Sequence, residues 1–240
     1  MNFAARGASF EKSMMQQMAK KPFPVIDGHV IKPGAKLAEA NLSGANLHNA
    51  NLYRANLHGA DLIRADLHNA NLHGADLRDA NLYGADLHNA NLYRADLRDA
   101  NLIMAQLIRA DLQGVNLQGA YLAKANLKGA KLGEAQLIRA DLQGVNLQGA
   151  YLGKANLHGA HLYSAELHGA DLRGAKLGDI REAFVTGAKV VNGRGREIEL
   201  RNFSDLPSQV AKKEGRFDQW IKRDRSGEGP AAITRPAVNP

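Results

Sequence analysis

Residues 45–64 read ANLHNANLYRANLHGADLIR, and the five-residue pattern in this stretch decides the fold. Leucine recurs at every fifth position from Leu37 to Leu177, 29 times without an exception. Alanine stands two residues before each leucine, except at Val115 and Val145, and Asn or Asp mostly stands between the two. The unit is therefore Ala-(Asn/Asp)-Leu plus two variable residues, and we number its five positions from the alanine. So short a period over such a length predicts a solenoid.

A period of five fits neither a helix, which needs apolar residues 3.6 apart, nor a strand, which needs them two apart. Within a unit, however, Ala and Leu are two residues apart, so a short extended step points both inward and the residue between them outward. The chain must then turn. Glycine at the fifth position, as at Gly59, Gly74, Gly119 and Gly149, readily supplies the positive φ of a tight turn. Each unit is thus predicted to be one short side and one corner.

Units such as Ala-Asn-Leu-His-Asn, Ala-Asp-Leu-Arg-Asp and Ala-Asn-Leu-Tyr-Arg resemble those of the pentapeptide-repeat family, and the resemblance covers about 145 of the 240 residues. It implies an all-β solenoid, a right-handed quadrilateral β-helix with four units per coil and an interior filled by Leu and Ala. The four-sided coil follows from the resemblance and not from the spacing. With it, 29 units make roughly seven coils, which rise by about one strand spacing each.

The chain divides into four segments. Residues 1–34 are expected to form an N-terminal helix, from about Ser9 to Lys20, and an extended lead-in that together cap the rod. Residues 35–192 form the β-helix, whose phase breaks after Leu177 and resumes, shifted by three residues, at Ala183 and Ala188. Residues 193–225 hold a short edge strand and a helix, and residues 226–240 form a flexible tail rich in Gly, Pro and Ala.

The helix expected in residues 193–225 carries an apolar stripe that must be buried against something. It either folds back over the last coil as a cap, which leaves a monomer, or packs against a second copy and forms a homodimer. We favour the cap, because the phase break leaves an end of the rod with no other cover. The stripe consists of Phe203, Leu206, Val210, Phe217, Trp220 and Ile221.

Charge and composition limit the classes of function that the chain can have. The net charge of +7 lies at the two ends, because residues 35–180 contain 14 basic and 14 acidic side chains. The chain has no cysteine, no apolar run of membrane-spanning length and no signal-peptide core, so we expect a cytoplasmic protein without a membrane span. None of the usual phosphate-binding, nucleophile or zinc-protease motifs occurs. We therefore expect no enzyme, no cofactor and no direct contact with nucleic acid.

With four units per coil, equivalent positions of successive coils stack into columns that could form a partner-binding face. Three histidines form one column, and a metal site is not expected from them, because three parallel imidazoles do not converge on a tetrahedral ion. An aromatic column, which His73 completes, and asparagine columns lie beside it. The candidate residues are His48, His68, His88, Asn49, Asn69, Asn89, Tyr53 and Tyr93.

Three functional hypotheses follow. The first is a non-enzymatic scaffold that presents flat β-helix faces to an unidentified protein partner. The second comes from the resemblance, because the family's quinolone-resistance members look like duplex DNA and bind DNA gyrase through an acidic rod. The neutral rod of this chain disfavours that role, since a DNA mimic needs negative columns. The third is a structural component of a larger assembly, held by its basic ends.

Overall fold

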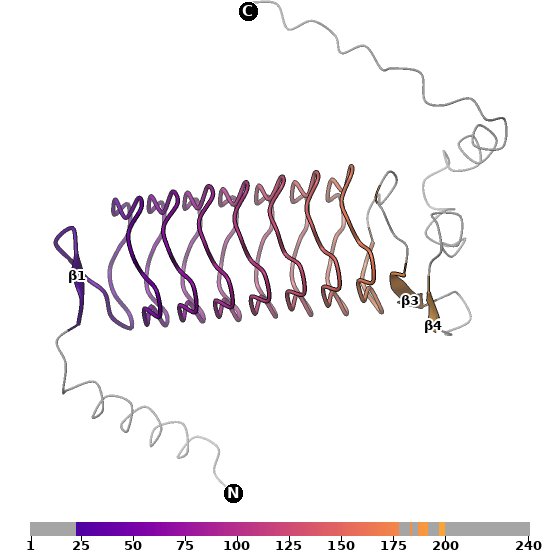
Figure 1. Ribbon diagram of the computed structural model, residues 1–240, viewed down its shortest axis with the longest axis horizontal. Helices are drawn as coiled ribbons and strands as arrows, with labels where there is room; N and C mark the ends of the chain where they lie inside the picture. The colour runs from indigo at the N-terminus through magenta and orange to yellow at the C-terminus, as the bar shows by residue number, and fades with distance from the viewer. Residues whose placement is uncertain (1–22, 178–182, 184–186, 192–196, 200–240) are drawn as a thin grey trace, which may run out of the picture.

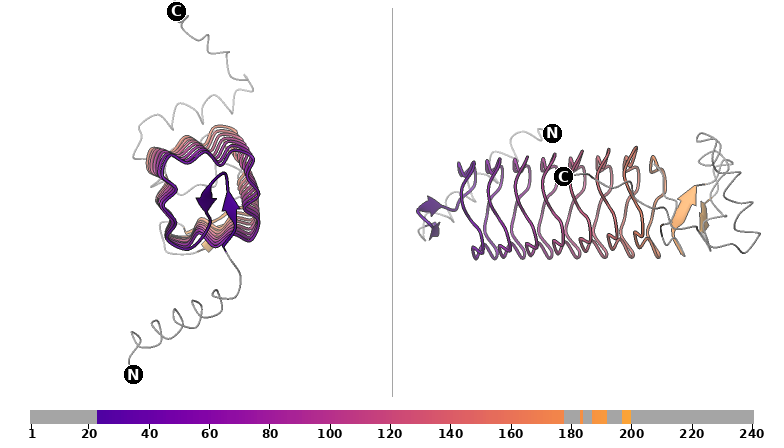
Figure 2. Two further views of the ribbon diagram at one scale, coloured as in Figure 1. Left: turned by 90° about the vertical axis from the view of Figure 1, so that its left-hand side faces the viewer. Right: turned by 90° about the horizontal axis from the view of Figure 1, so that it is seen from above.

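The computed structural model describes residues 23–177, 183, 187–191 and 197–199, and the described part is a square rod of stacked coils (Figures 1 and 2). Parallel β-bridges join each second-position residue to the second-position residue four units later, from Lys36 with Asn56 to Asn156 with Lys176. Four units therefore complete one turn, so the coil is four-sided, as the resemblance implied. The helices expected near residues 9–20 and 203–221 lie outside the described residues.

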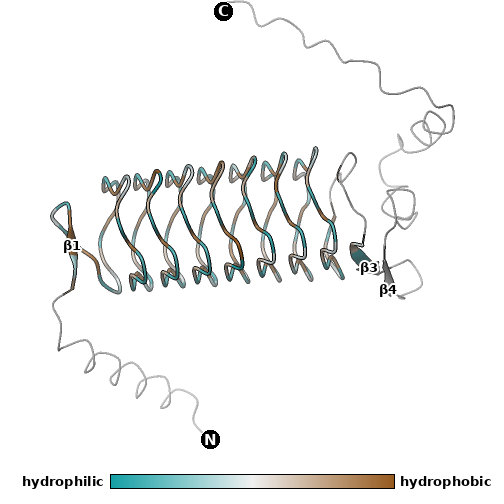
Figure 3. Cartoon of the chain, viewed as in Figure 1, coloured by the Kyte–Doolittle hydropathy of each residue, from teal (hydrophilic) through white to brown (hydrophobic). Residues whose placement is uncertain are grey.

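The rod has a solid interior made of leucine and alanine. Every leucine from Leu37 to Leu172 is 2% exposed or less, and nearly all of the alanines are equally buried. No polar or charged side chain is buried among the described residues. Figure 3 shows the resulting alternation of hydropathy along each coil. The expected inward orientation of the first and third positions is therefore confirmed.

Hydrogen bonding explains why the second position is mostly Asn or Asp. In the unit Ala100–Met104, the N–H of Ala100 closes a turn on Leu97, and those of Asn101, Leu102 and Met104 donate to carbonyls of neighbouring coils. The N–H of Ile103 has no backbone acceptor and instead donates to Oδ1 of Asn101, at 3.1 Å. The Asx side chain thus satisfies the one N–H of the unit that the coil leaves over.

The corner of each unit requires left-handed backbone at the fifth position, which closes a turn from the Leu carbonyl to the next Ala N–H. Gly149 has φ +63°, but Asn49 (φ 58°), Arg54 (φ 52°) and Met104 (φ 61°) adopt the same conformation. Long side chains at this position lean over glycine in the next coil, as Arg54 does over Gly74. Glycine is therefore one solution at the corner, and Asn, Arg or Lys is another.

A hairpin covers the N-terminal end of the rod. Strands β1 (Val25–Ile26) and β2 (His29–Val30) pair antiparallel through Asp27 and Gly28, both with positive φ. Ile31 is buried and Ile26 packs on the core, and Figure 2 shows the hairpin within the square outline of the coils. The extended lead-in expected here is therefore folded back on itself.

At the C-terminal end, strand β3 (Lys189–Val191) continues the last coil and strand β4 (Glu197–Glu199) pairs antiparallel with it. Asp171 bridges Lys189, whereas the regular spacing would pair it with Val191, so the last coil is two residues shorter. In a five-residue repeat, a loss of two residues gives the same phase as the shift by three read from the sequence. The shortened coil keeps Ala188 and Val190 in the core. Among the described residues, no helix has the length and apolar character needed to cross a membrane.

Candidate partner-binding surface

Three histidines stack on one face of the rod. His48, His68 and His88 each follow a buried leucine and stand on successive coils. The ring centroids of His48 and His68 are 5.1 Å apart with planes 23° apart, and those of His68 and His88 are 5.9 Å apart with planes 20° apart. The rings stack because the backbone rungs repeat at one strand spacing.

A second ladder of rings occupies the adjoining face. The Tyr53 and His73 centroids are 5.2 Å apart, those of His73 and Tyr93 are 5.1 Å apart, and the rings are tilted by about 50°. The guanidinium carbons of Arg54 and Arg94 lie 5.1 Å from the centroids of Tyr53 and Tyr93, respectively. These cation–π contacts restrict both tyrosines, and the sequence analysis did not foresee them.

Asparagines connect the two ladders. Asn49, Asn69 and Asn89 form the corner between the faces, with positive φ, which Asn tolerates better than most residues. Asn51, Asn71 and Asn91 occupy the second position and accept from the N–H groups of the aromatic column. The two ring columns and the two Asn columns together form one continuous surface, which we call the ladder surface.

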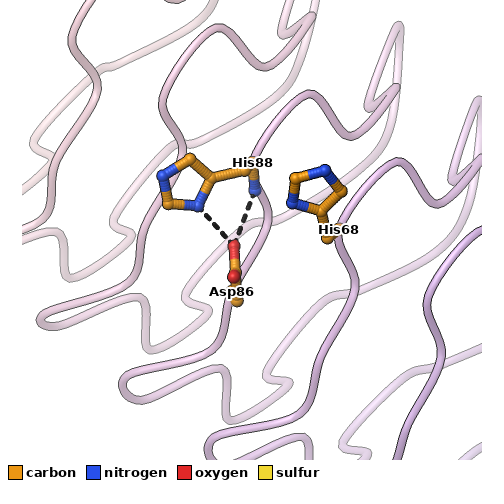
Figure 4. A group of neighbouring side chains, drawn as sticks. All are labelled: His68, Asp86 and His88. Carbon is orange, nitrogen blue, oxygen red and sulfur yellow. Dashed lines mark hydrogen bonds and ion pairs between the residues drawn. The ribbon is translucent and has the colours of Figure 1, made fainter.

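An aspartate beside the histidine column adds a negative charge to it. Oδ1 of Asp86 accepts from the backbone N–H of His88 at 3.0 Å and lies 2.5 Å from Nδ1 of the same residue (Figure 4). Burial raises the pKa of Asp86, but the hydrogen bonds from the backbone and ring of His88 outweigh it and lower the pKa of the carboxyl overall. Asp86 is therefore ionised at neutral pH.

The face opposite the histidine column carries self-paired charges. The guanidinium groups of Arg78 and Arg98 make two-pronged hydrogen bonds to Asp76 and Asp96, at 2.6–3.1 Å. The side-chain hydrogen bond from Arg78 lowers the pKa of Asp76. These pairs neutralise the aspartates of that face.

The structure thus brings the eight candidate residues together on two adjoining faces over three coils. The contacts of Arg54, Arg94 and Asp86 were not predicted from the sequence, although the repeat unit contains a signal for each. Arg54 and Arg94 stand at the fifth position directly after a tyrosine, and Asp86 stands at the second position two residues before a histidine. The apolar stripe from Phe203 to Ile221 lies outside the described residues, so its role stays a prediction.

The chain matches the family model for pentapeptide repeats, with eight copies over residues 34–69, 65–102, 105–144 and 140–179. No curated protein matches it. Among solved structures, a pentapeptide repeat protein from the Arabidopsis thaliana thylakoid lumen is 30% identical over 40% of this chain and 67% of that one, with a TM-score of 0.39.

Two other solved structures cover more of the chain. HetL, a pentapeptide repeat protein involved in heterocyst differentiation regulation in Nostoc sp. strain PCC 7120, is 31% identical over 77% of this chain and 97% of its own, with a TM-score of 0.22. QnrB1, a plasmid-mediated fluoroquinolone resistance protein, is 19% identical over the same shares, with a TM-score of 0.24. The likeness to QnrB1 concerns the fold alone.

Proposed function

Since this chain belongs to the pentapeptide-repeat family, whose fold is the right-handed β-helix, we propose that it is a non-enzymatic scaffold that binds a protein partner on the ladder surface. The observation that carries the proposal is the pair of stacked ring columns on adjoining faces, 5.1–5.9 Å between neighbouring centroids. From Ile103 to Gly153, by contrast, the fourth position holds only Gln, Ile, Lys, Gly and Ala.

The ladder surface has the physical properties of a binding site. Side chains that are already stacked lose little conformational freedom when a partner docks, so more of the contact energy appears as affinity. Tyr and Arg are also the residue types that most often dominate binding energy, and Tyr53 with Arg54 and Tyr93 with Arg94 supply two such pairs. The polar tips of Asn and His suit a partner with a mixed polar surface.

A binding role has more support than catalysis or DNA mimicry. Catalysis relies on desolvated groups with strongly shifted pKa values, and no described polar side chain is buried. A DNA mimic needs a continuous negative stripe, whereas Asp76, Asp96 and Asp171 are each paired with an arginine. Basic and acidic residues also balance over residues 35–180, at 14 each.

The test is capture of a partner by the full-length chain from an extract of the organism that makes it. Tyr53→Gln/Tyr93→Gln removes both tyrosines from the aromatic column, and Gln113 already occupies that column, so the fold tolerates the change. Tyr163→Gln is the matched control, because Tyr163 is 54% exposed on another face and Gln143 occupies its column.

A partner should be retained by the wild type and by Tyr163→Gln, and its affinity should fall at least about 30-fold in the double variant if the tyrosines are hot spots. Equal retention by all three proteins would contradict the proposal and favour an assembly component held by the basic ends. Equal loss in the control would also contradict it, because the ladder surface would then have no special role.

A further inference from the structure

The ladder surface holds a cluster of three groups that can bind a metal. One nitrogen each of His68 and His88 and one oxygen of Asp86 all lie within 4.8 Å of one another. Figure 4 shows a ring nitrogen of each histidine turned toward the carboxylate between them. The three side chains come from two successive coils and are half-buried, so the cluster is open to solvent on one side.

We propose that His68, Asp86 and His88 bind a divalent transition-metal ion, with Zn²⁺ the best fit, and that the ion joins two coils of the rod. Two imidazoles and one carboxylate are a common ligand set for zinc, with water at the fourth position. The harder ions Mg²⁺ and Ca²⁺ prefer sites made of oxygen atoms and do not suit this set.

The sequence pattern did not predict this site, because three stacked imidazoles cannot aim their lone pairs at one point. The structure replaces the third imidazole with a carboxylate. Nδ1 of His88 and Oδ1 of Asp86 are already 2.5 Å apart, so these two ligands converge before an ion arrives. Ligands about 2.1 Å from a tetrahedral ion lie about 3.4 Å from one another, so Asp86 and His88 have to separate slightly and the ring of His68 has to turn toward them.

The carboxylate is also held in place by the fold. Oδ1 of Asp86 accepts the N–H of His88, which is the Asx hydrogen bond of the unit, and this bond fixes the orientation of the carboxylate. Fixed outer hydrogen bonds of this kind orient ligands and raise metal affinity. The rungs between coils fix the distance between the backbones of His68 and His88, so the site is built on a rigid element.

The same residue types occur one coil earlier as His48, Asp66 and His68, which provides an internal comparison. There the Asp66 carboxylate accepts the backbone N–H of His68, at 3.0 Å. Among the described residues, the ligand atoms of His68, Asp86 and His88 lie within 4.8 Å of one another, and those of the earlier set do not form such a group. His68 can serve only one ion, so we assign the ion to the set in which two ligands already converge.

The test is calorimetric titration of the full-length chain with zinc chloride. Asp86→Asn keeps the Asx hydrogen bond, as Asn46 does in the same column, but removes the charged ligand. His88→Gln has its precedent in Gln148, and Asp66→Asn is the matched control. We expect about one tight zinc ion per chain, with affinity reduced by more than about tenfold in Asp86→Asn and His88→Gln and unchanged in Asp66→Asn.

Melting temperature gives a second readout, because an ion that binds only the folded chain raises it. Zinc should raise the melting temperature of the wild type and of Asp66→Asn, and should raise that of Asp86→Asn little. The proposal is wrong if the wild type binds no zinc below about 1 mM. It is equally wrong if Asp86→Asn binds like the wild type, or if Asp66→Asn loses as much affinity, because the column would then bind zinc without a defined site.

Discussion

Leu102 provides the sharpest test of the packing in the rod. Its side chain is fully buried, at 0% exposure, and the equivalent leucines of the coils before and after it, Leu82 and Leu122, are also buried. The backbone at Leu102 is fixed to the next coil, since its N–H donates to the carbonyl of Tyr121 at 2.7 Å. Because such rungs continue above and below, the coil cannot collapse around a missing side chain.

Leu102→Ala should therefore leave most of its cavity open. Leucine-to-alanine changes in cores destabilise by about 2.7–5.0 kcal/mol, and the larger losses come from sites that cannot relax. We expect about 4 kcal/mol for Leu102→Ala, measured as the free energy of unfolding in denaturant. The volume-conserving change Leu102→Met should lose less than about 1.5 kcal/mol.

Gln143→Ala is the surface control for this measurement. Gln143 lies on the same face of the rod, its side chain is exposed, and Ala123 already occupies its column. Its effect should stay within about 0.5 kcal/mol. If Leu102→Ala lost no more stability than this control, the leucine column would not be the packed core, and the assignment of inward and outward positions would be wrong.

Three further predictions test the corner, the Asx position and the charged face. Gly149 has φ +63° and open space where a Cβ would lie, so Gly149→Val should lose about 1–3 kcal/mol of stability through backbone strain alone. Gly149→Asn, with Asn49 as its precedent, should lose less, and equal losses in thermal melts would argue against strain. Asn126→Ala removes the acceptor of the Lys128 N–H and the donor to Gln106, so the free energy of unfolding should fall by about 0.5–1.5 kcal/mol. Asn126→Asp keeps the acceptor and should lose less stability. The opposite order would refute the role of the Asx hydrogen bond. The hydrogen bond from Arg78 lowers the pKa of Asp76, so this pair stabilises the fold above the unfolded pKa of about 4, and its contribution is lost as the pH falls through the lower folded pKa. Wild type and Arg78→Gln should therefore differ in stability at neutral pH and converge as the pH falls through that folded pKa. A difference that grew with acidification would have the wrong sign.

The sequence predicted the rod because its pattern follows directly from geometry. Alanine and leucine two residues apart must share a side, so the period of five predicted the inward positions that the structure confirms. The number of sides could not be derived in this way, because the pattern marks where the corners lie but not the angle at each. That number came from the family resemblance, and the bridges between every unit and the fourth unit after it confirm it.

The ends of the rod were harder to predict, although signals were present. Asp27 and Gly28 stand between Val25–Ile26 and His29–Val30, and an Asp-Gly pair between apolar residues is a strong hairpin signal. The nearby prolines drew attention to an extended chain instead. The C-terminal phase shift was readable, because Ala188, Lys189 and Val190 repeat the order of Ala170, Asp171 and Leu172, which they follow in the structure.

At the candidate surface, the columns were predictable but the contacts between side chains were not. A repeat of four units per coil placed the histidines and tyrosines in stacks, which the ring distances bear out. Rotamers decide whether Asp86 contacts His88, and identical residue types one coil earlier form no comparable cluster. A repeat pattern cannot distinguish two coils that it describes with the same letters.

The ladder surface also differs from the rest of the rod in a way that the fold does not require. The first and third positions are buried, and an Asn or Asp at the second supplies an acceptor for the spare N–H, so the preferences at these three positions follow from the coil itself. The fourth position makes no such demand, as shown by Gln113, Gly133 and Gly153, which occupy the column of Tyr53 and Tyr93 without breaking it. The coil therefore does not require the rings that stand at that position in three successive coils. The proposed binding role would account for them, and variants that copy the rod's own alternatives onto the ladder surface would separate binding from folding.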